Sequence, residues 1–329
     1  MFFLSKDQGQ MPAVYCLPAR RGGIPGLIPT QLSSIVDGHP RVIAMSIFDA
    51  WDSVDCCHKT GKSLVEFYNL HGFELFLTLS PTSFFSCRAT DSSVSCDMPS
   101  GRVSLTLQHW SDFVRVLKPT YAEQLYDTAS LCEISSAKRK RTSCCRTARW
   151  FQECSSQCPP GCVVLSPNGV DSRGEFDGNS NLNESIGTRF FQIRKMMNRD
   201  ADIKLISADN VPAMILAILS GATHVVGDFP VHLSEKGIAL ILSKNTQKPT
   251  LNLHDSTLMN NLDPLQNDCR CFTCKRHTKA YLCHLLSVNE MNAFSLLLIH
   301  NLTQLVDLAI QQEQDLLRVL RLFTAKNAL

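Results

Sequence analysis

Three cysteines near the C-terminal end restrict the fold of this chain more than any other feature of its sequence. Cys269, Cys271 and Cys274 lie within six residues, and His300 follows twenty-six residues after Cys274. A tight turn lets three thiolates at this spacing converge, and one imidazole from the following helix would complete a tetrahedral Cys3His zinc site. Such a site has no open coordination position. We therefore expect one structural Zn2+ per chain, contributing several kcal/mol to folding.

The spacing alone leaves two questions open about this cluster. Its fourth ligand is not fixed, because His277, Cys283 and His284 are also near in the sequence. Three cysteines could also fall together by chance in a chain that has 15 of them. For the remaining cysteines we expect buried, reduced thiols rather than disulfides, because the first residues form too short an apolar run for an export signal.

The composition indicates a packed globular protein. Of its 329 residues, 44% are hydrophobic and 19% are charged, which excludes a wholly disordered chain. Lys and Arg number 32 against 30 Asp and Glu, so a nucleic-acid or membrane partner would need a local basic patch. The most apolar stretch, residues 211–226, is interrupted by proline, glycine and polar residues. We therefore expect a soluble, intracellular protein without a membrane span.

Short apolar runs alternate with longer helical patterns along the chain, which favours an α/β fold. Between residues 209 and 221, a helix-start signal at Asp209-Asn210-Val211-Pro212 and a stop at Gly221 predict a crossover helix. This helix would join two parallel strands. The predicted strands are apolar and partly β-branched, as in strands buried on both faces, and lie at 42–47, 162–165, 203–206 and 223–226.

The C-terminal part of the chain has a different pattern. Residues 244–268 are polar and predict a long connection. From Phe294 to Leu320, apolar residues recur at helical spacing, which predicts one long helix or two consecutive helices packed through an apolar stripe. We therefore divide the chain into an α/β barrel body at 1–243 and a zinc-binding subdomain with C-terminal helices at 244–329.

The cysteine cluster and several other segments resemble one enzyme family. The stretch from Cys269 to Leu286, followed by Asn289-Glu290 and Ile299-His300-Asn301-Leu302, is similar to the zinc-binding signature of the tRNA-guanine transglycosylases. In that family the last histidine of the signature is the fourth zinc ligand, so the resemblance assigns this role to His300. Further similar segments lie at 20–25, 101–106, 205–207, 221–222 and 229–240.

The resemblance also implies a fold and a substrate. The family is built on a TIM-type (β/α)8 barrel with a helical zinc subdomain, and it exchanges guanine at the wobble position of certain tRNAs for queuine or its precursor. For queuine these are tRNAs with GUN anticodons (Asp, Asn, His, Tyr). This chain departs from the family between 165 and 183, where a Gly- and Asn-rich segment replaces an expected strand and helix. We therefore expect a barrel that is abbreviated or lacks one β/α unit.

The residues that carry the family's chemistry do not match in this chain. The resemblance places Val226 at the Asp nucleophile that attacks the ribose C1′, and an isopropyl group cannot form a glycosyl ester. His232 stands in place of a family Arg, Tyr126 in place of a second carboxylate, and the Asp-Ser-Gly-Gly-Phe-Gln motif is absent. This pattern resembles the non-catalytic eukaryotic branch of the family, so we assign no catalytic residue. Asp228 is the alternative nucleophile of an active enzyme, but two residues displace a carboxylate by about 6 to 7 Å along a strand.

The resemblance implies two partners, a catalytic paralogue in a heterodimer and tRNA. It also implies a cytoplasmic protein, which is either cytosolic or attached peripherally to the mitochondrial outer membrane. A basic run at Lys138, Arg139, Lys140 and Arg141, with Arg146 and Arg149 beyond it, is the best candidate for tRNA contact. The alternatives are a solvated helix face for this run and, for the whole chain, a zinc-dependent scaffold without a tRNA role.

Overall fold

A computed structural model describes residues 12–79, 87–98, 101–127, 137–157, 163–164, 205–244 and 246–324. The departure from the family at 165–183 falls outside these residues, with no described residue after 164 until 205. No helix in the described ranges combines the length and apolarity needed to span a membrane. The cysteines whose side chains are described are free thiols, as the sequence predicts, but Cys56 and Cys145 are exposed and not buried as expected.

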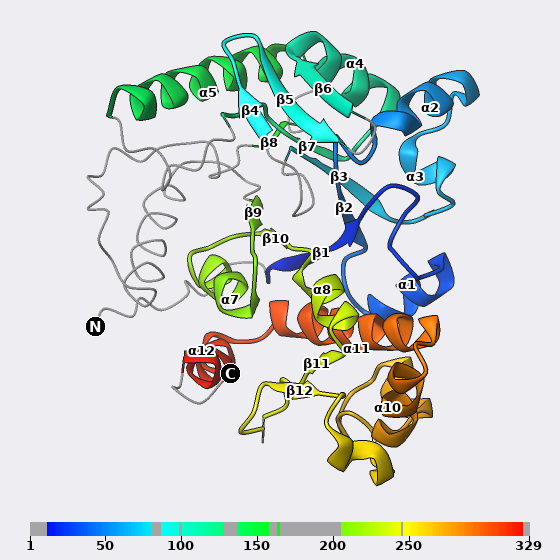
Figure 1. Ribbon diagram of the computed structural model, residues 1–329. Coiled ribbons are helices and arrows are strands. Elements are labelled where there is room, and N and C mark those ends of the chain that lie inside the picture. The colour runs from blue at the N-terminus through cyan, green and yellow to red at the C-terminus, as the bar shows by residue number, and fades with distance from the viewer. Residues whose placement is uncertain are drawn as a thin grey trace.

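A seven-stranded sheet forms the centre of the molecule, with the order β8-β7-β3-β2-β1-β10-β9. All of its neighbouring strands are parallel, and the sheet curls as in part of a barrel (Figure 1). The predicted α/β class with a barrel-type sheet is confirmed. Its strands are β1 (Val14–Ala19), β2 (Val42–Ser46), β3 (Glu74–Thr78), β7 (Tyr121–Glu123), β8 (Val163–Val164), β9 (Leu205–Ser207) and β10 (His224–Val226).

Both faces of this sheet are apolar. Successive residues along a strand point to opposite faces, and each face packs in a different hydrophobic core. One face forms a small cluster that includes Cys16, Ala44 and Phe76. The other face joins the large core between sheet and helices, to which Leu17 and Leu75 belong. This is the pattern of a parallel sheet covered on both sides. The bounds of the four strand runs predicted from the sequence lie within two residues of the observed bounds.

The predicted crossover unit between β9 and β10 is present. Helix α7 (Val211–Leu219) begins after Asn210, whose side chain accepts a hydrogen bond from the Ala213 amide, and Pro212 lies in its first turn. The chain then turns through Gly221, which has a φ of +92° and therefore favours glycine. Strands β9 and β10 pair in parallel on either side of this helix in sequence.

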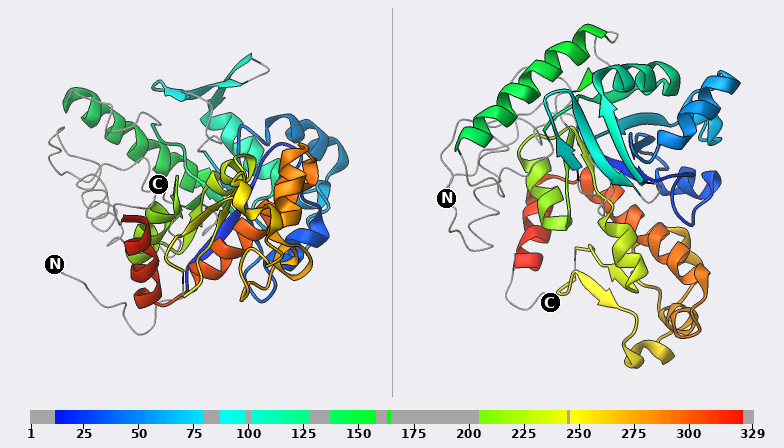
Figure 2. Two further views of the ribbon diagram at one scale, coloured as in Figure 1. Left: turned by 60° about the horizontal axis from the view of Figure 1, so that its bottom comes forward. Right: turned by 45° about the horizontal axis from the view of Figure 1, so that its top comes forward.

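A three-stranded antiparallel sheet, which the sequence did not predict, stands out from the body (Figure 2). It consists of β4 (Cys87–Ala89), β5 (Ser93–Met98) and β6 (Gly101–Thr106). Its strands are rich in serine and only partly apolar, so they lack the continuous hydrophobic runs that revealed the central strands. Helices α4 (Leu107–Leu117) and α5 (Ala137–Gln157) pack beside each other in this region.

The C-terminal apolar pattern forms two consecutive helices, α11 (Met291–Ala309) and α12 (Glu313–Thr324), as expected. The sequence predicted packing through one apolar face, but α11 is buried on nearly every side. It packs against α1, α8, α9 and strands β1 and β11.

The remaining elements are α1 (Pro29–Ile35), the 3-10 helix η1 (Trp51–Ser53), α2 (Val54–Thr60), α3 (Leu64–Phe67), α8 (Phe229–Glu235), β11 (Ile238–Leu240), β12 (Thr250–Asn252), η3 (Ser256–Asn260), α9 (Phe272–Arg276) and α10 (Lys279–Ser287).

Strands β11 and β12 form an antiparallel pair that lies across the predicted boundary at 243/244. Much of the polar segment 244–268 follows this pair as turns and η3. The division into 1–243 and 244–329 stays a prediction.

Acid should destabilise the protein partly through His224, which lies between Phe76 and Tyr121 with ring centroids 5.7 Å from each. Burial lowers the pKa of His224 from 6.5 to about 4. As pH falls through the unfolded value, only the unfolded chain binds this proton, so stability is lost from about pH 6.5 down to about pH 4. We expect about 2 kcal/mol of this loss between about pH 7 and pH 5.

The measurement is urea unfolding of the wild type and of His224→Gln at both pH values. The variant should lose about 2 kcal/mol less than the wild type over this interval. Equal losses in the two proteins would show that His224 is not buried in its neutral form.

Candidate metal centre and the end of strand β10

The four residues of the predicted zinc cluster come together in the folded chain. The Sγ atoms of Cys269, Cys271 and Cys274 lie 3.6, 3.5 and 3.3 Å from Nδ1 of His300. All four ligand atoms lie within 4.8 Å of one another, and all four residues are buried. This arrangement can hold one metal ion.

Local structure explains how the cysteines converge. Residues 266–271, which we call the cysteine loop, lead into the short helix α9, which contains Cys274. Cys271 is the N-cap of α9, and its sulfur accepts a hydrogen bond from the Cys274 amide at 3.3 Å. This cap turns the chain so that both thiols face the same point. His300 approaches that point from the middle of α11.

The alternative fourth ligands are placed elsewhere. His277 stacks on Tyr281 with ring centroids 5.0 Å apart, and Cys283 and His284 lie on helix α10. None of the three belongs to the group of converging ligand atoms. In the fold it is His300 that joins the three cysteines, as the family resemblance implies.

The distances fit a tetrahedral metal. With Zn–S of about 2.3 Å and Zn–N of about 2.05 Å, sulfur and nitrogen ligands of one zinc ion lie about 3.6 Å apart. The observed 3.3–3.6 Å is close to this value. The other ring nitrogen, Nε2 of His300, lies 2.7 Å from the Leu240 carbonyl. Because that carbonyl can only accept, Nε2 carries the proton and Nδ1 offers its lone pair to the metal.

The pKa values of Cys269, Cys274 and His300 also indicate that this cluster can bind a cation. Hydrogen bonds from Cys271 and Cys274 hold the pKa of Cys269 far below that of an ordinary thiol, whereas hydrogen bonds with Cys269 and Cys271 raise the pKa of Cys274. Burial alone would lower the pKa of His300, but its contacts with Cys269 and Cys271 raise it to about 9. Three thiolates this close cannot all ionise unless a positive charge balances them. A divalent metal supplies that charge.

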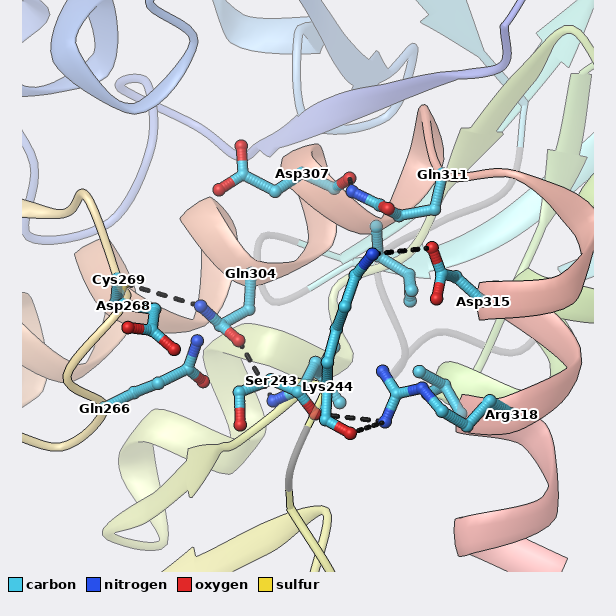
Figure 3. A pocket seen from close by; sticks show the side chains of 13 residues that line it. Ser243, Lys244, Gln266, Asp268, Cys269, Gln304, Asp307, Gln311, Asp315 and Arg318 are labelled. Carbon is cyan, nitrogen blue, oxygen red and sulfur yellow. Dashed lines mark hydrogen bonds and ion pairs between the residues drawn. The ribbon is translucent and has the colours of Figure 1, made fainter.

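Amide side chains of α11 connect the metal ligands to strand β11. The Gln304 Nε2 donates to the Cys269 sulfur at 3.4 Å, and its Oε1 accepts from the Leu242 amide at 3.0 Å. Figure 3 shows Gln304 between these two groups, at the wall of a polar cavity of about 470 Å3. The Asn301 amide accepts from the Leu240 N–H and donates to the Ile238 carbonyl. Each of these groups orients a ligand or the strand beside it.

An arginine in the cysteine loop ties this region to the barrel body. Arg270 donates to the Asp307 carboxylate on α11 and to the carbonyls of Ser34 and Ile35 on α1. Gln304, Asn301 and Arg270 were not identified from the sequence as parts of the site. The signal for Gln304 was its position four residues after His300, on the same face of α11.

At the end of β10, the predicted nucleophile position is occupied by an apolar side chain. Val226 pairs with Cys16 on β1 and with Ser207 on β9, and it packs against the small inner core of the curled sheet. The next carboxylate, that of Asp228, lies at the start of α8. It is 3.2 Å from Arg20 Nη2 and 3.4 Å from His232 Nε2.

The other predicted positions fall in two further places. Tyr126 is buried, and the neighbouring Asp127 forms an ion pair with Arg146. Arg146, expected as a possible RNA contact, is itself buried and also pairs with Asp91. The basic run lies in helix α5, where Lys138 is exposed; the side chains of Arg139, Lys140 and Arg141 lie outside the described residues.

Comparisons with known proteins agree with this site. Residues 192–316, which include all four metal ligands, match the family model described as queuine tRNA-ribosyltransferase. Over these residues the chain is similar to that family. It is also similar to a queuine tRNA-ribosyltransferase accessory subunit 2 of Trichoplax adhaerens, at 24% identity over 86% of this chain and 79% of that protein.

Two further similarities are shorter. An accessory subunit 2 of Caenorhabditis elegans is 31% identical over 29% of this chain and 26% of that protein. A queuine tRNA-ribosyltransferase of a Cyanothece strain is 34% identical over 32% of this chain and 26% of that protein. The chain thus aligns with about a quarter of the length of each of these two relatives.

The Cys271→Ala variant should no longer bind one metal ion per chain. Loss of one thiolate leaves three ligands and an unbalanced buried site, so we expect the free energy of unfolding to fall by several kcal/mol. Metal content by inductively coupled plasma mass spectrometry and thermal unfolding measure the two effects. Cys283→Ala, a buried thiol of α10, is the control and should keep one metal per chain. Equal metal content in the two variants would contradict the assignment.

The Gln304→Leu variant should retain the metal but release it faster. Leucine removes the hydrogen bond to the Cys269 sulfur, and loss of such an outer contact typically weakens metal affinity about 10- to 100-fold. Transfer of the metal to a chromophoric chelator measures the rate. Gln311→Leu, which alters another amide at the wall of the same cavity, should release metal at the wild-type rate. If both variants behave alike, Gln304 does not orient the ligand.

Proposed function

We propose that this chain is the non-catalytic accessory subunit of a heterodimeric queuine tRNA-ribosyltransferase. In this proposal a catalytic paralogue exchanges guanine for queuine at the wobble position of tRNAs with GUN anticodons (Asp, Asn, His, Tyr). This chain supports the partner and the tRNA and forms no covalent intermediate. Its Cys269, Cys271, Cys274 and His300 bind one structural Zn2+.

The apolar end of β10 carries the proposal. Glycosyl transfer with a covalent intermediate needs a carboxylate that reaches the ribose C1′. Val226 offers only an isopropyl group at the position where the family resemblance places that carboxylate. Asp228 is a poor substitute, because its carboxylate forms an ion pair with Arg20 and lies 3.4 Å from His232 Nε2. It also lies two residues after Val226, at the start of α8 and outside β10, and attack geometry tolerates little displacement of the nucleophile.

The similarity to accessory subunits also supports a non-catalytic role for this chain. The Trichoplax relative aligns over most of both chains and is named an accessory subunit, as is the relative from Caenorhabditis elegans. An accessory subunit requires a catalytic partner. We propose that the pair is cytoplasmic, with peripheral association of this chain with the mitochondrial outer membrane.

The zinc assignment rests on the donor set. Three thiolates and one imidazole in tetrahedral arrangement favour zinc over oxygen-preferring cations such as magnesium or calcium. The four protein ligands fill the coordination sphere, so the zinc we propose stabilises the fold. For tRNA, we propose contact through the basic run Lys138, Arg139, Lys140 and Arg141 on α5.

A base-exchange assay with radiolabelled guanine and a tRNA transcript tests the proposal. The chain alone should show no exchange above background, whereas an equimolar mixture with its catalytic paralogue should be active. The Asp228→Asn variant should leave the activity of the mixture within about twofold of the wild type, since no step is assigned to that carboxylate.

Two results would contradict this proposal in different ways. Exchange by the chain alone, abolished by Asp228→Asn, would identify an active transglycosylase. Full activity of the paralogue without this chain, together with normal queuosine in the tRNA of cells lacking it, would instead identify a scaffold without a tRNA role.

A further inference from the structure

A polar pocket lies on the outer side of α5, separate from the metal centre and from the end of β10. Its volume is about 480 Å3. It opens between α5 and the turn that joins β4 to β5, which contains Asp91. Its walls are Asp91, Lys138, Thr142, Cys145, Arg146 and Arg149.

The five helical residues of this pocket form one face of α5. Their spacing of three, four or one residues places them along a single side of a helix, over about three turns. Helix α5 also concentrates positive charge. It contains six of the chain's 32 basic residues and one of its 30 acidic residues. The nearly neutral chain therefore has a local basic surface of the kind that a polyanion needs.

Arg146 fixes the floor of the pocket. Its guanidinium, only 8% exposed, pairs with the buried carboxylate of Asp127 and with the exposed carboxylate of Asp91. These two carboxylates neutralise Arg146, so we assign it no role as an anion ligand. Its role is to hold the β4–β5 turn against the helix.

Lys138 and Arg149 supply the positive charge at the mouth. Lys138 is exposed, and the Arg149 side chain is 50% exposed. One Arg149 nitrogen, Nη2, donates to the Asp91 carbonyl at 2.6 Å, which orients the guanidinium at the rim. Glu153 lies 4.0 Å from its Nε and is the nearest opposing carboxylate on α5. An oriented guanidinium and a mobile ammonium on either side of a polar pocket are suited to a phosphate group.

We propose that this pocket binds a backbone phosphate of RNA through Lys138 and Arg149. The proposal rests on the proposed function for the identity of the RNA, a tRNA. RNA is favoured over a small free anion because three further basic residues, Arg139, Lys140 and Arg141, follow Lys138 directly in the sequence of α5, so the helix offers charge for more than one phosphate. It gives the tRNA contact a defined location, with Arg146 as the positioning residue.

The experiment measures tRNA binding by the heterodimer with fluorescence anisotropy at several salt concentrations, using a transcript with a GUN anticodon. The test variant is Lys138→Glu with Arg149→Glu. The matched control is Lys59→Glu with Lys62→Glu, the same charge change at two exposed residues in and just after α2. Lys138→Gln with Arg149→Gln repeats the test without charge reversal, and thermal unfolding verifies that each variant folds.

We expect the test variant to weaken tRNA binding about tenfold and to reduce the salt slope by about 1, the value for one lost phosphate contact. The control should change affinity less than about twofold. Unchanged affinity and slope in both test variants, with normal wild-type binding, would overturn the phosphate pocket and leave the accessory role intact. Weaker binding to phosphatidylserine vesicles with unchanged tRNA affinity would overturn it in favour of a membrane contact. Failure of the wild-type heterodimer to bind tRNA would instead count against the proposed function.

Discussion

The buried polar side chains of α11 hold the C-terminal part of the molecule together. Strand β11 pairs with β12 along one edge, and its other edge would leave backbone groups unpaired inside the protein. His300, Asn301 and Gln304 satisfy these groups by hydrogen bonds to Leu240 and its neighbours. An unpaired buried backbone group costs about 1 to 3 kcal/mol, so this set of contacts fixes where the strand can lie. Because His300 belongs to the Cys3His cluster and Gln304 contacts the Cys269 sulfur, a metal bound by this cluster would be coupled to the position of the strand.

The same contacts extend to the end of the barrel strands. Asn301 donates to the Ser234 hydroxyl on α8, the helix that begins directly after β10. At that junction the Tyr15 hydroxyl donates to the Gly227 carbonyl at 2.6 Å. Any Cβ at residue 227 would lie 2.1 Å from the Ala208 carbonyl oxygen, so only glycine fits. The backbone beside the reacting position of the family is thus tightly fixed, although the side chain at Val226 has no chemistry. A rigid scaffold without a nucleophile is what an accessory subunit requires.

The sequence predicted the elements whose signals are local. The strand runs at 42–47 and 223–226 could be recognised because both faces of a parallel sheet are apolar, and α7 could be recognised from its Asn210 cap. Cys269, Cys271 and Cys274 could be recognised as a metal-binding group because three cysteines within six residues can converge through one tight turn. The fourth ligand was different. It comes from a helix twenty-six residues away, so only the family resemblance could select His300 before the fold placed it.

Other features could not be predicted, because they depend on contacts between distant segments. The antiparallel sheet of β4 to β6 lacks continuous apolar runs, and the alternation of polar and apolar residues in β5 (Ser93–Met98) is too short to identify the whole sheet. Arg146 looked like part of a basic surface, yet it is buried between Asp91 and Asp127, which lie 55 and 19 residues away in the sequence. A charge pattern alone cannot separate a solvated cation from a buried one that has partners.

The central claim is that the chemistry belongs to another polypeptide. The most direct test is to incubate the heterodimer with a tRNA transcript and a guanine analogue that stalls the reaction, denature the mixture, and identify by mass which protein carries RNA. We expect the covalent adduct on the catalytic paralogue alone, with this chain at its unmodified mass. An RNA adduct on this chain, above all in the absence of any other protein, would contradict the claim.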